Sequence, residues 1–430
     1  MTSAPGDQAA RSTRGFRAYW ALVALIVGLG LGMLAGELEP GVREAALGTA
    51  SFVGTLWLNA LKMTVIPLVV ALLIVGIAKG AEAAQGGRIA GRTVLWIVII
   101  CTISSVLGAL ATIALTGAFP LARETAAGLQ AALGGIEQKA PAELPGIIDF
   151  FKGVVPDNVV AAATNGDVLP LVVFAALFAL ALGHIAEGSR RTVVGLFEAI
   201  GDALLIVIAW VLWIAPVGVF ALAFTVGAEA GAAAFAGLGH YVIVISLIGI
   251  IVTLASYPLA VIGGGCSLGR FAKGMIAPHA VAISTRSSLA SLPAMLAAAR
   301  TIGVREQVAD VTLPISVALF RATGPAMNTA VAFYVAHWLG LEPTLAQMIA
   351  ATAVGALMSY GAVSLPGEVS FISSIAPIAM ALGVPIAPLA LLVAVEMVPD
   401  IFRTLGNVTL DVAVTTVVDR SVGEEPAEAG

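Results

Sequence analysis

The stretch from Pro388 to Val418 constrains this chain most strongly, because it is apolar enough to lie in a bilayer and yet carries a series of polar side chains. These polar residues are Glu396, Asp400, Arg403, Thr404, Asn407 and Asp411. At about 100° per residue, positions 396, 400, 403, 407 and 411 fall within roughly one quarter of a helix circumference. Ionisable groups at membrane depth cost on the order of 3 kcal/mol each and usually mark a substrate or ion path. The stretch therefore predicts a membrane-spanning helix with one functional polar stripe, and a purely structural network between helices is the alternative.

The composition is that of an all-α polytopic membrane protein. The chain is 59% hydrophobic and 11% charged, whereas a soluble protein is about 25% charged. Apolar runs of spanning length predict eight transmembrane helices near 18–36, 47–78, 93–117, 168–186, 192–226, 233–265, 308–338 and 385–418. The sequence contains no Walker motif and no metal-ligand spacing of histidine or cysteine, so an ATP-driven pump and a metal site are disfavoured. An intramembrane hydrolase is disfavoured too, because Ser287 and Ser288 have no histidine near them in sequence. We do not expect an enzyme.

Basic residues predict the orientation of the spans. They gather before the first span, between spans two and three, between four and five, and after six. These are alternate connections, so the positive-inside bias places them in the cytoplasm together with both termini. Residues 1–17 then form a cytoplasmic arm, 419–430 a polar cytoplasmic tail, and 118–165 a long outer connection. We expect a multi-pass protein of the cell inner membrane.

Two segments, 275–305 and 346–383, do not read as simple spans. Each has apolar flanks and a central tip rich in Ser, Gly and Pro, at Ser284–Pro293 and Ser359–Ser370. Each also starts and ends on one side of the predicted topology. They predict two re-entrant helical hairpins that enter from opposite sides, a pattern that points to a transporter binding site. Ordinary kinked spans are the alternative.

Span seven is predicted to be broken within Gly324–Thr329. Pro325 lacks an N–H group and clashes with the preceding helical turn. A break there would free backbone and side-chain groups to line a site, whereas a simple proline kink would leave the helix continuous.

These features, in this order, resemble the dicarboxylate/amino acid:cation symporter family, which includes the glutamate transporters. The resemblance covers residues 15–420 and includes Leu61–Ala78, Asn165–Gly183 and, most specifically, the Asp400-x-x-Arg-Thr-x-x-Asn-x-x-x-Asp411 pattern. It implies the glutamate-transporter fold in a membrane-embedded homotrimer with no nucleic-acid partner. It also implies a scaffold domain (18–78 and 165–226) and a transport domain (93–117 and 233–418) that slides across the membrane as an elevator.

The resemblance also implies the substrate site. Arg403 corresponds to the arginine that binds the substrate's side-chain carboxylate, and Asp400 to the carboxylate that binds its amino group. A guanidinium suits a carboxylate because it donates two parallel hydrogen bonds. The resemblance assigns further substrate contacts to Thr404, Asn407, Thr329, Ser287, Ser288, Leu365 and Gly367.

The family's sodium ligands are not retained. In span seven the family's Asn-Met-Asp-Gly-Thr is replaced by Pro325-Ala-Met-Asn-Thr329, and three ligand positions of span three are Ile97, Ile100 and Cys101. Side chains without oxygen do not suit hard cations. In addition, Arg321 replaces a small residue near Asp411 and is expected to pair with it as a fixed internal cation. A residual sodium site near Thr323 and Ser359 is the alternative.

Together these observations predict a secondary transporter of L-glutamate or L-aspartate that needs no cofactor and no sodium, with proton coupling favoured. Glu368 at the second tip and Glu396 are the candidate proton carriers, because burial disfavours a charged carboxylate. The alternatives are a C4-dicarboxylate carrier of the same fold, a symporter with fewer sodium sites, and an anion channel. Asp400 argues against the dicarboxylate carrier, because such a substrate has no ammonium group to pair with it.

Overall fold

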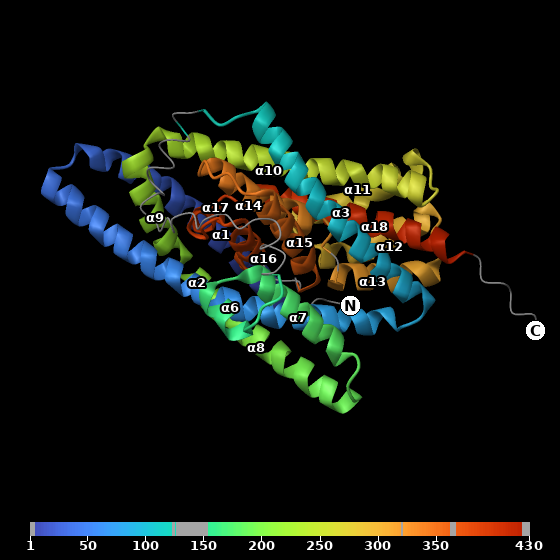
Figure 1. Ribbon diagram of the computed structural model, residues 1–430. Coiled ribbons are helices and arrows are strands. Elements are labelled where there is room, and N and C mark those ends of the chain that lie inside the picture. Colours follow the sequence, from blue (N-terminus) through green and yellow to red (C-terminus); the bar gives the residue numbers. More distant parts are fainter. Residues whose placement is uncertain (1–4, 123–124, 126–153, 320, 362–366, 424–430) are drawn as a thin grey trace, which may run out of the picture.

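The computed structural model describes residues 5–122, 125, 154–319, 321–361 and 367–423, with side chains from Trp20 onward except at 361 and 367–370. Within this part every regular element is helical. The first half of the chain forms the helices α1 Pro5–Leu34, α2 Pro40–Ala84, α3 Arg88–Ala118, α6 Val159–Asn165, α7 Val168–Leu182, α8 Glu187–Trp213, α9 Ala215–Ala230 and α10 Ala232–Pro258 (Figure 1). A 3-10 turn, η1 Ala35–Glu37, follows α1, and a π-helical turn, η2 Leu259–Gly263, follows α10.

The second half is built from shorter helices. They are α11 Leu268–Thr285, α12 Ser288–Ile302, α13 Glu306–Leu319, α14 Thr323–Trp338, α15 Leu345–Gly361, α16 Gly367–Leu382, α17 Ala387–Leu392 and α18 Met397–Val422. Among the described residues, six helices are long and apolar enough to cross a membrane, and five further apolar helices are shorter than 18 residues. This mixture confirms an all-helical polytopic membrane protein.

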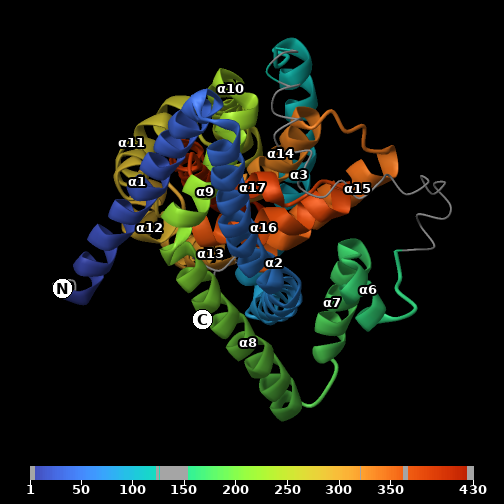
Figure 2. The same cartoon turned by 90° about the vertical axis from the view of Figure 1, so that its left-hand side faces the viewer.

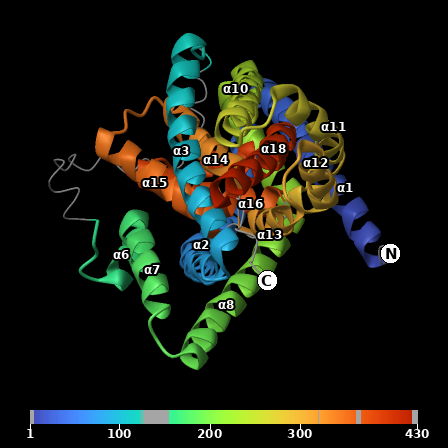
Figure 3. The ribbon, with the colours of Figure 1, turned by 90° about the vertical axis from the view of Figure 1, so that its right-hand side faces the viewer.

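Two groups of helices lie on either side of α2. One group contains α6, α7 and α8, and the other contains α3 and α10 to α18 (Figures 2 and 3). Within the second group α14 is central: it contacts α3, α10, α16 and α18, and almost all of its residues are buried. Helix α14 is therefore surrounded by protein, as a segment that carries a site should be.

The predicted fifth span, 192–226, is two helices in the structure. Helix α8 ends at Trp213 and α9 begins at Ala215. Pro216 explains the break, because it cannot donate to the preceding turn and is tolerated only at the start of a new helix. Helix α9 then packs closely on α1: a Cβ atom on Gly32 would lie 2.2 Å from the Phe224 carbonyl oxygen.

Helix pairs occur where the hairpins were predicted. Helices α11 and α12 pack against each other, as do α15 and α16. The first pair begins at Leu268 rather than at residue 275. At its tip, Arg286 adopts a left-handed backbone conformation with φ 48°, and the Ser287 hydroxyl accepts a 3.2 Å hydrogen bond from Ala290 N. Ser287 is thus the N-cap of α12, and the reversal of the chain is built from the TRSS segment itself.

The predicted break in span seven is wrong in position. Residues 324–329 are helical, and the chain is non-helical just before them, at Arg321 and Ala322. Pro325 lies in the first turn of α14, where its missing N–H group needs no partner. The free N–H of Thr323 donates to Asn407 Oδ1 of α18 at 2.9 Å, so span eight satisfies the start of α14.

The prediction of one continuous helix from Pro388 to Val418 is also wrong. Helix α17 ends at Leu392, a turn follows, and α18 begins at Met397. Pro399 accounts for the interruption, because its ring would clash with the carbonyl of Val395 in a continuous helix. Glu396 therefore lies in the turn that precedes α18, and the other stripe residues lie on α18.

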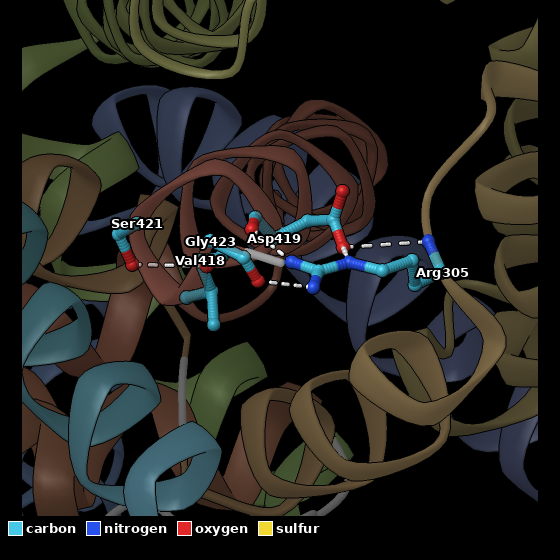
Figure 4. Close-up of polar contacts among 5 residues, drawn as sticks. All are labelled: Arg305, Val418, Asp419, Ser421 and Gly423. Atoms are coloured by element: carbon cyan, nitrogen blue, oxygen red, sulfur yellow. Dashed lines mark hydrogen bonds and ion pairs between the residues drawn. The ribbon is translucent and has the colours of Figure 1, made fainter. Parts of the chain in front are cut away.

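The far end of α18 is tied to the loop between α12 and α13 (Figure 4). Arg305 Nε donates to Asp419 Oδ1 at 2.7 Å, and the same guanidinium donates to the backbone carbonyls of Asp419 and Gly423. Arg420 donates to the carbonyl of Ile262 in η2 at 2.8 Å. These contacts fix the base of the first hairpin to span eight.

Candidate functional site

The site is built around the buried guanidinium of Arg403 on α18. Its Nη2 atom lies 2.6 Å from Glu396 Oε1, and its Nη1 atom lies 3.7 Å from Asp400 Oδ1. Only 7% of the Arg403 side chain and 3% of the Glu396 side chain are exposed. Tyr241 of α10 donates a 2.9 Å hydrogen bond to Glu396 Oε2. Glu396 and Tyr241 thus hold Arg403 in one orientation, which favours a binding role over a mobile surface charge.

A second guanidinium reaches the cluster from the tip of the first hairpin. Arg286 Nη1 lies 3.8 Å from Asp400 Oδ2, so Asp400 lies between Arg286 and Arg403. The sequence analysis singled out this tip but not Arg286, although the TRSS pattern was a usable signal. Tyr241 was missed as well, because nothing in an apolar span distinguishes a tyrosine that faces a carboxylate.

A small cavity opens beside Arg403. It is formed by α14, α15, α16 and α18 together with the segment that precedes α14. Its lining residues are Arg321, Gly324, Asn328, Met358, Ser359, Ser374 and Arg403. Two guanidiniums, one amide and two hydroxyls therefore meet in one space next to the second hairpin. Such convergent donors suit an anionic ligand with more than one oxygen-bearing group.

The comparisons with known proteins agree with this architecture. The family model described as "Sodium:dicarboxylate symporter family" matches residues 18–421. The chain belongs to this family. It is 30% identical to the proton/sodium-glutamate symport protein of Bacillus subtilis (strain 168), over 94% of each chain. It is 27% identical to the C4-dicarboxylate transport protein of Laribacter hongkongensis (strain HLHK9), over 92% of this chain and 88% of the relative. It is also 27% identical to the proton/glutamate-aspartate symporter of Escherichia coli (strain K12), over 91% and 89%.

Not all substrate residues implied by the family resemblance border the cavity in this symporter-family chain. Thr329 Oγ1 lies 2.8 Å from Ser105 Oγ, and Thr404 Oγ1 donates to the Asp400 carbonyl at 2.9 Å. Asn407 caps the start of α14, and Ser287 and Ser288 form the start of α12. Leu365 lies outside the described residues, as do the side chains of Gly367 and Glu368. The structure thus brings Arg403 to the cavity, with Asp400 beside it.

The expected pairing of Arg321 with Asp411 is wrong for this structure. Asp411 is fully buried, and neither carboxylate oxygen has a hydrogen-bond partner within the described part of the chain. Arg321 instead lines the cavity, and among the described side chains Asp400 and Arg403 are the charged groups near it. The break before α14 places Arg321 on the cavity side, away from the middle of α18.

The positions at which the family resemblance implies a loss of sodium ligands are buried in apolar packing. Ile97, Ile100, Cys101 and Met327 are each at most 7% exposed and belong to the main hydrophobic core. Cys101 Sγ contacts Ser359 Oγ at 3.3 Å. None of these four side chains carries an oxygen atom, so they do not fit the oxygen shell that a hard cation takes.

The residues named for a residual sodium site are oxygen-bearing and lie in suitable surroundings. Thr323 Oγ1 is buried and has no hydrogen-bond partner among the described residues. Ser359 borders the cavity. Their hydroxyls therefore fit a cation better than the four apolar side chains do.

Proposed function

We propose that this protein is a secondary transporter of acidic amino acids, L-glutamate or L-aspartate, in the cell inner membrane. The observation that carries the proposal is the buried guanidinium of Arg403, held by Glu396 at the edge of a cavity beside the second helix pair. Relatives named for glutamate, aspartate or C4-dicarboxylates support it. We also propose the eight-span topology with two re-entrant hairpins and cytoplasmic termini.

The proposed mechanism is an elevator in which a transport domain moves against a scaffold. The packing supports this division, because α1, α2, α7, α8 and α9 mainly contact one another, and α3, α10 to α16 and α18 do the same. Helix α2 also contacts α3, α15 and α16 at the boundary. The apolar exposed side chains of α2 and α8, such as Phe52, Leu56, Trp210 and Trp213, suit the proposed contacts with lipid and with neighbouring subunits of a homotrimer.

The transport proposal is tested with purified protein in liposomes. Uptake of labelled L-aspartate, L-glutamate and succinate is measured with sodium and proton gradients imposed separately. We expect saturable uptake of an acidic amino acid and faster labelled entry when unlabelled substrate is loaded inside. A preference for succinate over both amino acids would favour the C4-dicarboxylate carrier. The absence of acceleration by internal substrate would favour an anion channel.

Transport is predicted to be independent of sodium. The apolar packing of Ile97, Ile100, Cys101 and Met327 leaves those positions without hard oxygen ligands. Replacement of sodium by choline is expected to change aspartate affinity by less than about threefold, or under ~0.7 kcal/mol. The measurement is equilibrium binding to purified protein at constant ionic strength. A loss of tenfold or more would instead show a working sodium site, for which Thr323 and Ser359 are the candidates.

We propose that transport is coupled to protons in place of sodium. Glu368 and Glu396 stay the two candidate carriers, and Glu396 is engaged by Arg403 and Tyr241. A proton taken up by Glu396 would weaken its ion pair with Arg403. The side chain of Glu368 lies outside the described residues. Comparison of uptake with and without an imposed proton gradient tests the coupling itself.

A further inference from the structure

Arg321 occupies a position from which it can share a ligand with Arg403. It lies just before α14, and both guanidiniums line the same small cavity. Among the described side chains, Asp400 and Arg403 are the charged groups near Arg321. Asn328, Ser359 and Ser374 supply polar groups to the same space. The cavity is therefore flanked by two cations, only one of which the polar stripe of span eight provides.

Among the carboxylates whose side chains the structure describes, which excludes Glu368, none forms an ion pair with Arg321. The neighbouring carboxylates are already engaged, since Asp400 lies between Arg286 and Arg403, and Glu396 is held by Arg403 and Tyr241. Arg321 is half-buried, so its guanidinium has lost part of its water, and an anionic ligand would compensate for that loss. The location of Arg321 on a cavity lining indicates where such a ligand would bind.

The formal charges near the cavity also favour an anionic ligand. The guanidiniums of Arg286, Arg321 and Arg403 and the carboxylates of Asp400 and Glu396 form one charged cluster with one positive charge in excess. This count leaves out Asp411, which lies further along α18 and makes no ion pair with the cluster among the described side chains. A glutamate or aspartate zwitterion carries one net negative charge. Its binding would neutralise the cluster without any added cation.

We propose that Arg321 is a substrate-binding, specificity-determining residue: Arg403 binds one carboxylate of the substrate and Arg321 binds the other. The inference rests on the proposed transport of acidic substrates and deepens it. It applies equally to amino acids and to C4-dicarboxylates, because both carry two carboxylates. It also requires that ligands with a single carboxylate bind much more weakly.

The first test compares three variants in equilibrium binding of L-aspartate. Arg321→Gln removes the charge and is expected to weaken binding at least tenfold. Arg321→Lys keeps the charge without the planar fork and is expected to lose less. Arg191→Gln is the matched control, because it removes one positive charge at an exposed site that pairs with Glu187 in its own helix, and it should bind like wild type. Unchanged binding by Arg321→Gln would overturn the proposal.

The second test separates a contact from a general effect on folding. Wild type and Arg321→Gln are compared for displacement of labelled aspartate by L-aspartate and by its two monoamides, L-asparagine and L-isoasparagine. If Arg321 contacts one carboxylate, the substitution weakens aspartate at least tenfold but changes the affinity of one monoamide by less than about twofold. Equal weakening of all three ligands would overturn the proposal. If the wild type binds neither aspartate nor succinate, the proposed function itself is refuted.

Discussion

Substitution of Arg403 by alanine is expected to reduce the affinity for acidic substrates at least 100-fold, or by about 2.7 kcal/mol. Arg403 is 6% exposed, lines the cavity and is oriented by an ion pair of 2.6 Å with Glu396. A buried carboxylate of the substrate would lose its bidentate partner, and such charge-assisted hydrogen bonds are the strong ones. Equilibrium binding of labelled aspartate and glutamate to purified protein measures the loss.

The control for this prediction addresses a purely structural role. Removal of Arg403 leaves Glu396 buried with only Tyr241 as partner, and that unpaired charge could by itself disturb the site. The double variant Arg403→Ala with Glu396→Gln removes the unpaired charge. We expect it to remain unable to bind substrate. Recovery of wild-type affinity in the double variant would show that Arg403 only balances Glu396.

Substitution of Gly108 by valine is expected to abolish stable folding of the transport core. A Cβ atom at Gly108 on α3 would lie 2.1 Å from the carbonyl oxygen and 2.6 Å from the Cα atom of Ala326 on α14. Both contacts involve backbone, so the two helices must separate. Overpacking of this kind costs on the order of 3 kcal/mol or more. The thermal midpoint and the monodisperse fraction in detergent measure the effect.

The same helix offers a matched control for the valine substitution. Gly117→Val places an identical side chain on α3 where no atom lies within 4 Å of the new Cβ. It carries the same change in helix propensity but no clash, so its thermal midpoint should stay close to wild type. If Gly117→Val were as destabilising as Gly108→Val, the clash with Ala326 of α14 would not be the cause, because valine has a higher helix propensity than glycine and Gly117 has no such neighbour.

Much of the functional architecture follows from the sequence. Five polar residues in one apolar span predicted a charged cluster, because charged groups at membrane depth need partners, and Glu396, Asp400 and Arg403 do lie together. Two Ser/Gly/Pro-rich tips predicted helix pairs, and helix pairs occur there. Residue identity alone showed that the side chains of Ile97, Ile100, Cys101 and Met327 cannot offer oxygen ligands. These inferences needed only side-chain chemistry and helical periodicity.

The tertiary structure decided where the helices are interrupted and which residues pair with one another. Pro216, Pro325 and Pro399 were all visible, yet whether a proline breaks a helix or begins a new one depends on which neighbouring groups satisfy the freed backbone. Asn407 accepts the hydrogen bond of the Thr323 N–H group. The break in span seven therefore precedes Pro325. That shift decides the position of Arg321.

The contacts between residues of different helices could not be predicted from the sequence, for a related reason. Helical periodicity relates residues within one helix only, and the break before α18 removed Glu396 from the helix that carries Arg403. Their 2.6 Å ion pair, the hydrogen bond from Tyr241 and the approach of Arg286 to Asp400 all join separate elements. The sequence by itself determined that a charged site lies within the membrane part of this protein. Only the packing of the helices decided which charges neutralise one another, and that Arg321 faces the cavity rather than Asp411.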